Sequence, residues 1–133
     1  LGQDLSDRVA LAYSELAIHR ACEEILTLVD AVNKYLDERA PWTLFKQGKQ
    51  TEVERVIYSV LESIRLAGYL LAPVIPNLSN KIYQQLGFAD DFNADSLPAF
   101  VTHAGWGLLP AGRTLEKAEP IFARLELSID DSL

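Results

Sequence analysis

Apolar side chains recur at helical spacing through the first third of the chain. They fall three or four positions apart between Leu5 and Leu36, a range that predicts helix. The clearest run is Ile25, Leu28, Val29, Val32 and Leu36. The stripe slips between Tyr13 and Ala17, which favours two helices that meet near Ser14 to Leu16 over one long rod.

Prolines and a broad apolar face set the next boundaries. Pro41 lacks an amide donor and disfavours helical angles at Ala40, so the second helix should end at residues 38–40. Residues 42–50 are expected to form a short turn carrying a glycine. Thr51, three residues before Glu54, suits a capping box at a new helix start. From Val53 to Leu71 a wide apolar face predicts the most buried helix, which Pro73 closes.

A shorter helix is expected next, with Pro76 in its first turn and its end at Gly87. Its apolar stripe is Leu78, Ile82 and Leu86. From Phe88 onward, aspartates, prolines and glycines interrupt every longer pattern. The sequence therefore predicts an all-α fold, an up-and-down bundle of about four helices over residues 1–87. Residues 88–133 form a loop and an irregular C-terminal arm of the same domain.

Composition narrows the class of protein. The 133 residues carry 12 Lys plus Arg against 19 Asp plus Glu, a net charge of −7, with one cysteine and no methionine. A single cysteine excludes an internal disulfide, and the longest apolar stretch, Leu66 to Ile75, is too short to span a bilayer. We expect a cytoplasmic protein with no membrane association, and a fragment of a longer chain. The acidic balance argues against sequence-blind nucleic-acid binding, but not against a reader of exposed bases. The sequence leaves the oligomeric state open.

Candidate catalytic and metal sites are weak. His19 and Cys22 are three residues apart and can share a helix face, yet no third group is placed to orient them. Asp91, Asn93 and Asp95 match the start of a calcium loop, but its glycine and its final glutamate are missing. The cysteine and the two histidines lack zinc-ligand spacing. Most other charges are expected to solvate helix faces.

The most informative segment runs from Asn33 to Trp42. Its polar side chains can hydrogen-bond inside a bundle at the end of a long helix, and Pro41 then fixes the chain direction. The indole of Trp42 has two possible roles. It can fill the core, as most tryptophans do, or it can offer its face to an unpaired base.

The segment Asn33-Lys34-Tyr35-Leu36-Asp37-Glu38-Arg39-Ala40-Pro41-Trp42 resembles the C-terminal anticodon-binding domain of methionyl-tRNA synthetases. The resemblance continues in Leu70-Leu71-Ala72-Pro73-Val74-Ile75-Pro76 and in a closing stretch, residues 116–124, with the pattern Lys-x-Glu-Pro. It covers residues 11–126, and the three motifs stand in the family's order.

The resemblance implies a domain that reads the CAU anticodon of a methionine tRNA. Trp42 and Pro41 match the family's RNA-binding positions, with Trp42 stacking on the cytosine, while Asn33 and Asp37 support the site. The closing arm, with Ile121, Phe122 and Arg124, is expected to return toward the catalytic domain of the same protein and to leave an apolar patch.

Two departures limit what these residues do alone. The resemblance implies that the family's asparagine and arginine that also read the anticodon belong to a helix upstream of Leu1. The signatures that bind ATP, with Mg²⁺, are absent from these residues as well, so we expect this chain to have no cofactor and no catalytic residue of its own. Phosphate attraction is then expected mainly from the rest of the synthetase. A stand-alone helical domain that docks a partner through its C-terminal arm is the alternative.

Overall fold

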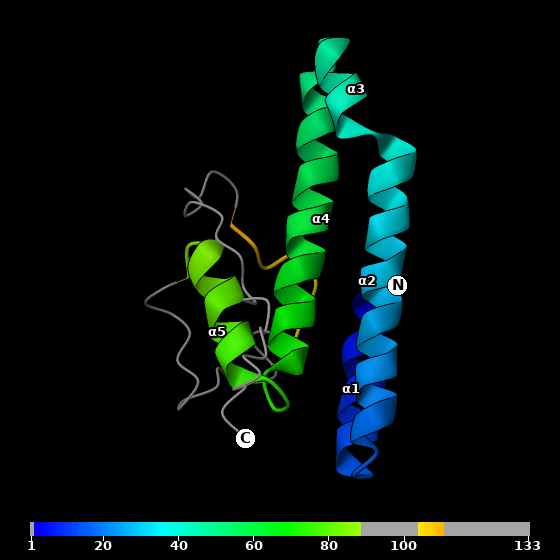
Figure 1. The fold of residues 1–133 in the computed structure, drawn as a ribbon, viewed down its shortest axis with the longest axis vertical. Coiled ribbons are helices and arrows are strands. Elements are labelled where there is room, and N and C mark those ends of the chain that lie inside the picture. The colour runs from blue at the N-terminus through cyan, green and yellow to red at the C-terminus, as the bar shows by residue number, and fades with distance from the viewer. Residues whose placement is uncertain (1, 89–103, 111–133) are drawn as a thin grey trace, which may run out of the picture.

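The computed structural model describes residues 2–88 and 104–110, and within them the chain forms five helices (Figure 1). They are α1 (Gly2–Ser14), α2 (Ile18–Arg39), α3 (Pro41–Lys46), α4 (Gln50–Leu71) and α5 (Pro76–Gln85). The long helices α2 and α4 lie antiparallel, with α1 packed on α2 and α5 packed on α4 (Figure 1). The described residues contain no strand, which confirms the all-α prediction.

The predicted break between the first two helices is confirmed. Residues 15–17 join α1 to α2, and Leu16 takes a positive φ of 57°. The amide of Leu16 donates to the carbonyl of Tyr13 at 3.0 Å, and the amide of Ala17 donates to that of Ala12 at 2.9 Å. These bonds close the last turn of α1, so the chain reverses without a glycine.

Two local predictions are wrong. Residues 42–46, expected as part of a turn, belong to the helix α3. The helix α4 begins at Gln50 with Lys49 as its N-cap and no side-chain cap, so the Thr51 capping box is not formed. Instead Gln50 Nε2 donates to the Glu54 carboxylate at 3.1 Å, one turn further along.

The core lies along α4, as predicted. This helix has ten buried residues, and its buried leucines, alanine and tyrosine contact side chains of α1, α2 and α5. The Tyr13 hydroxyl of α1 donates to the carbonyl of Leu70 at 2.7 Å, which ties the two helices together. The predicted face is nevertheless too broad, since Ile57 and Ile64 remain exposed.

The helix α5 approaches α4 closely at Gly68. A Cβ at this position would lie 3.0 Å from Cγ2 of Ile82, so a larger residue would require the Ile82 side chain to shift. The predicted stripe of α5 is correct in part. Leu86 is buried, but the most deeply buried residues of the helix are Ser79 and Tyr83.

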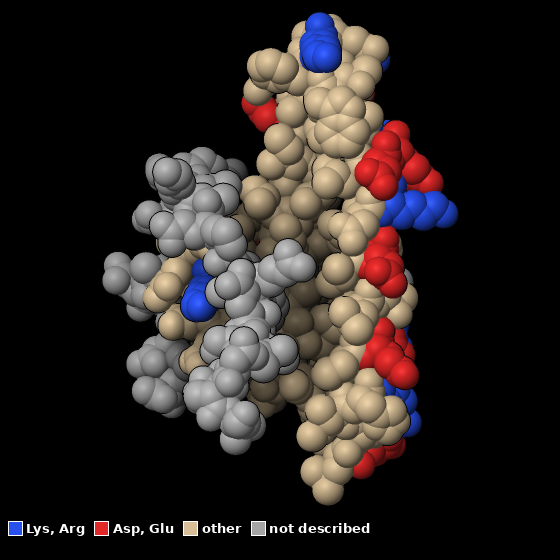
Figure 2. Space-filling view, in the orientation of Figure 1, with Lys and Arg blue, Asp and Glu red and all other residues tan. Residues whose placement is uncertain are grey.

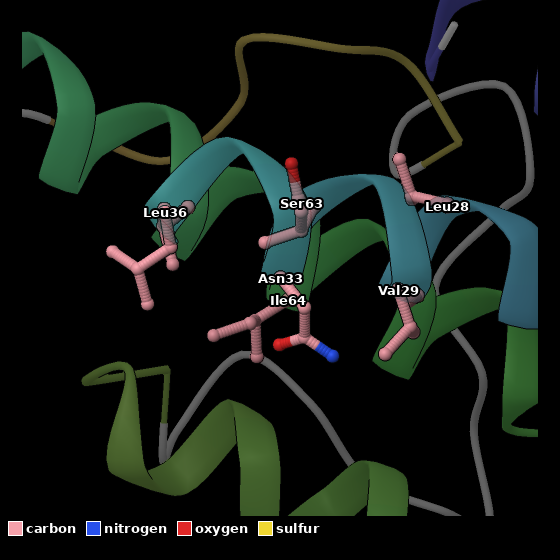
Figure 3. A pocket seen from close by; sticks show the side chains of 9 residues that line it. Leu28, Val29, Asn33, Leu36, Ser63 and Ile64 are labelled. Carbon is pink, nitrogen blue, oxygen red and sulfur yellow. The ribbon is translucent and has the colours of Figure 1, made fainter. Parts of the chain in front are cut away.

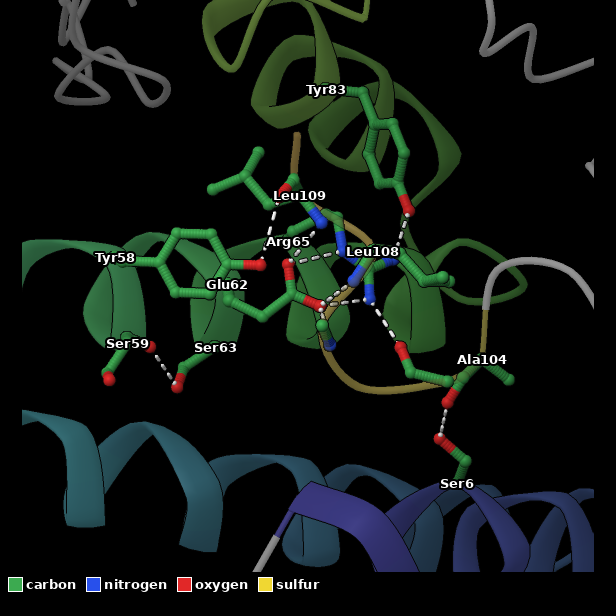
Figure 4. A network of polar contacts seen from close by, with 12 residues as sticks. Ser6, Tyr58, Ser59, Glu62, Ser63, Arg65, Tyr83, Ala104, Leu108 and Leu109 are labelled. Carbon is green, nitrogen blue, oxygen red and sulfur yellow. Dashed lines mark hydrogen bonds and ion pairs between the residues drawn. The ribbon is translucent and has the colours of Figure 1, made fainter. Parts of the chain in front are cut away.

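A fully buried ion pair joins α4 to the segment 104–110. Nε and Nη2 of Arg65 donate to the two carboxylate oxygens of Glu62 at 2.9 and 2.8 Å, and neither side chain has exposed surface. The same carboxylate accepts the backbone amides of three consecutive residues at 2.8 to 3.0 Å (Figure 4). These are Gly107, Leu108 and Leu109. The expectation that the acidic residues solvate helix faces is therefore wrong for Glu62.

Further hydrogen bonds fix the same segment. Arg65 also donates to the carbonyl of Gly105 at 2.7 Å and to the Tyr83 hydroxyl of α5 at 3.1 Å. The Tyr58 hydroxyl donates to the carbonyl of Leu109 at 2.9 Å, and Ser6 of α1 donates to that of Ala104 at 2.5 Å (Figure 4). These bonds join the segment 104–110 to α1 and α4, and Arg65 links the same network to Tyr83 of α5.

We expect Glu62→Gln to lower the free energy of unfolding by about 3 to 5 kcal/mol, because it removes one charge of a fully buried ion pair. Urea denaturation followed by circular dichroism measures this loss. Glu54→Gln, on the exposed side of α4, is the matched control and should change stability by less than about 0.5 kcal/mol. Similar effects of the two substitutions would contradict a structural role for the pair.

Burial raises the pKa of Tyr83 from 10.0 to about 12, although the charge and hydrogen bond of Arg65 act in the opposite direction. Because the pKa is raised in the folded state, the contribution of Tyr83 to the free energy of unfolding is fully present below pH 10 and is lost as the pH rises toward 12. We expect the free energy of unfolding to fall by on the order of 2 to 3 kcal/mol over that range because of this tyrosine.

Tyr83→Phe removes the ionisable group and should flatten this part of the stability profile. The measurement is the free energy of unfolding at pH 9 to 12, with Tyr35→Phe as the control on α2. A profile for Tyr83→Phe as steep as that of the unsubstituted chain would show that Tyr83 does not ionise on unfolding.

Candidate nucleic-acid interface

The junction between α2 and α3 depends on one residue. Ala40 has φ 44° and ψ 67°, a left-handed conformation that costs an alanine roughly 1 to 2 kcal/mol. Its amide donates to the carbonyl of Leu36 at 3.0 Å and so ends α2. Its own carbonyl accepts the amides of Thr43 and Leu44 at 2.9 and 3.2 Å and so begins α3. Pro41 follows at the first helical position, where no amide donor is needed.

The far end of α3 is fixed in a similar way. The amide of Lys49 donates to the carbonyl of Leu44 at 3.1 Å, and Gly48 between them adopts a φ of 73° with open space on its Cβ side. The helix α3 packs against α4 at the end of the bundle (Figure 1). It is therefore a short helix held at both ends by backbone hydrogen bonds.

Trp42 lies on α3 with 53% of its surface exposed. Filling the core, one of the two roles that the sequence left open, is therefore excluded by the structure. The exposed indole leaves room for a base to stack on it. Pro41, its neighbour, is half-buried. The RNA-binding roles of both residues remain predictions.

Asn33 and Asp37 are exposed on α2, one helical turn apart. Neither side chain hydrogen-bonds another described residue, so the expectation of hydrogen bonds inside the bundle is wrong for both. The amide of Asn33 instead lies beside Ile64 of α4 (Figure 3). No recorded contact brings Asn33 or Asp37 to Trp42, and their supporting role stays a prediction.

An apolar groove runs between α2 and α4, with a volume of about 170 Å³. Figure 2 shows the hollow between the two helices, and Figure 3 shows side chains that line it. Its walls are Leu28, Val29, Val32, Asn33, Leu36, Val60, Ser63, Ile64 and Ala67. The Ser63 hydroxyl donates to the carbonyl of Ser59 at 2.7 Å, which leaves Asn33 as the main polar group of the groove.

Charged side chains of both signs lie along this side of the molecule. Asp and Glu, with Lys and Arg among them, follow the outer edge of α2, and Lys or Arg also stands at the end where α3 lies (Figure 2). Residues 39–51 include Arg39, Lys46 and Lys49 and no carboxylate, although the whole chain has a net charge of −7. The guanidinium of Arg39 lies 5.6 Å from the ring centre of Tyr35, a cation–π contact at the end of α2.

The other candidate sites gain no support. His19 is exposed and Cys22 half-buried, with no hydrogen bond between them. Within residues 2–88 and 104–110, no cluster of histidine, cysteine or carboxylate side chains is placed to hold a metal ion. The calcium-like loop at Asp91, Asn93 and Asp95 lies outside the described residues.

The C-terminal arm, with Ile121, Phe122 and Arg124, also lies outside the described residues. The helices within the described part of the chain are all too short or too polar to cross a bilayer.

Sequence reasoning assigned no role to two exposed residues near Trp42 in the chain. Phe45 lies three positions further along α3, and Arg39 is the last residue of α2. The three-residue spacing of Trp42 and Phe45 places them on one side of a helix. The interpretation of residues 42–50 as a turn hid this relation.

Comparison with known proteins identifies the family of this chain. A family model described as the anticodon-binding domain of methionyl tRNA ligase matches residues 1–131. Methionine–tRNA ligases of Synechocystis sp. and Nostoc sp. are each 54% identical to the chain, over 98% and 95% of its length. The chloroplastic and mitochondrial methionine–tRNA ligase of Arabidopsis thaliana is 39% identical over 95%. No solved structure matches the chain.

The chain spans about a quarter of the length of these relatives, from 26% in Synechocystis to 20% in Arabidopsis. The alternative of a stand-alone interaction domain finds no support, since the matched proteins are much longer ligases. The family model covers nearly every residue, including all of the described ones. The chain therefore belongs to the family of anticodon-binding domains of methionyl-tRNA ligases.

Proposed function

We propose that the chain binds the CAU anticodon loop of a methionine tRNA, with Trp42 stacking on the cytosine. The exposure of the indole at the end of the bundle carries this proposal, because a stacking platform needs an accessible ring face. The helix α3 that presents the ring is held at both ends by backbone hydrogen bonds. The indole is thus oriented before the RNA arrives, which reduces the entropy lost on binding.

Attachment of methionine to the tRNA, with ATP and Mg²⁺, belongs in this proposal to a catalytic domain outside the residues of this chain. The relatives, which are about four times as long, bear the name of that ligase. The chain supplies recognition: base stacking here places the tRNA so that its other end reaches the catalytic domain. The protein would work in the cytoplasm, where tRNA is charged.

Asn33 and Asp37 have a defined place in the proposal. Both side chains are exposed on the last turns of α2 that precede Ala40. Their polar groups have no hydrogen-bond partner among the described residues and are available to nucleotides beside the stacked cytosine. They would position the loop, whereas Trp42 supplies most of the binding energy.

We expect Trp42→Ala in the complete ligase to lower kcat/KM for tRNA charging by about 5- to 150-fold, the equivalent of one lost base–aromatic stack. Amino-acid activation, measured as methionine-dependent exchange of pyrophosphate into ATP, should not change. Trp42→Phe keeps a flat ring and should lower kcat/KM for charging less than Trp42→Ala does. Equal losses in charging and in activation would show instead that Trp42 supports the fold.

A further inference from the structure

The outer face of α3 carries more than Trp42. Successive residues of an α-helix are rotated by about 100°, so Phe45, Trp42 and Lys46 fall within one arc of about 100°. Leu44 falls on the opposite side and is half-buried, in agreement with the packing of α3 on α4. Two rings and a cation therefore point away from the bundle together.

Phe45 is the most exposed aromatic side chain among the described residues, at 67%. A phenylalanine in this position contributes little apolar burial to the stability of the fold, since most of its surface stays in contact with water. No contact between this ring and another aromatic ring is recorded. The Cβ atoms of residues three apart on a helix are about 5 to 6 Å apart, so Phe45 and Trp42 are neighbours on the surface of α3.

The charge around these rings indicates the kind of partner. Arg39, Lys46 and Lys49 fall within thirteen consecutive residues, 39–51, that contain no carboxylate. The other nine cations of the chain share its remaining residues with all 19 carboxylates. Glu38 and Glu52 flank this segment directly, so the basic stretch is short. Cations beside exposed rings favour a single-stranded nucleic acid, whose phosphates and bases need both, over an apolar peptide.

We propose that Phe45 is a second stacking side chain, which contacts the adenine next to the cytosine held by Trp42. This inference rests on the function proposed above. The two rings are spaced to meet neighbouring nucleotides of an opened loop, and the basic segment attracts the phosphates between them. Phe45 thereby acts on the middle base of the CAU anticodon, a position for which the sequence left the contacting residues open.

The test uses the complete ligase and an RNA hairpin with a CAU anticodon in which 2-aminopurine replaces the adenine. Stacking quenches the fluorescence of this analogue, so the signal reports on the middle base directly. Phe45→Leu keeps an apolar side chain but removes the flat ring, and Phe45→Tyr keeps the ring. Ile18→Ala, an exposed apolar position at the other end of α2, is the control.

We expect Phe45→Leu to weaken hairpin binding at least about fivefold and to abolish the quenching, while Phe45→Tyr and Ile18→Ala retain both. The exposed position of Phe45 allows the substitution without loss of the fold, which circular dichroism verifies. Unchanged affinity and unchanged quenching in Phe45→Leu would overturn the role of Phe45 and leave Trp42 as the stacking residue. If the unsubstituted ligase shows no preference for CAU over a hairpin with another anticodon, the proposed function itself fails.

Discussion

Glu62 and Arg65 form an ion pair with no exposed surface at the point where α4, α5 and the segment 104–110 meet. Removing both charges from water is costly, and the cost is offset only when every polar atom finds a partner. The carboxylate accepts five hydrogen bonds, two from Arg65 and three from backbone amides of the segment. The pair is therefore stable only when the distant segment is in place, which couples residues more than forty positions apart.

This coupling holds α4 in place, and the two ends of the helix have different surroundings. One end is buried between α1, α5 and the ion pair, whereas the other carries α3 in solvent (Figure 1). Ala40 holds α3 through an unfavourable backbone conformation that its hydrogen bonds compensate. A stacking side chain on such a rigid support meets an RNA loop at low entropic cost, and the helix α3 that carries it contains no carboxylate of its own.

Periodicity and prolines were enough to predict the long helices and their order. The break at residues 15–17, the end of α2 before Pro41 and the burial of α4 all follow from local chain properties. The helix α3 was missed because six residues are too few for a periodic signal. The Glu62–Arg65 pair was missed for a different reason. A glutamate and an arginine three apart resemble a surface pair, and only contacts with the distant residues 104–110 show that they are buried.

At the site, the sequence identified Trp42 but left open whether its indole fills the core or faces solvent. The structure shows that it faces solvent.

A double-mutant cycle between Trp42→Ala and an abasic first position in a CAU hairpin, both measured as hairpin affinity for the complete ligase, separates stacking from every other effect. If the indole stacks on the cytosine, either change alone weakens binding, and Trp42→Ala has no further effect once the base is absent. Losses that simply add would contradict the contact between this ring and that base.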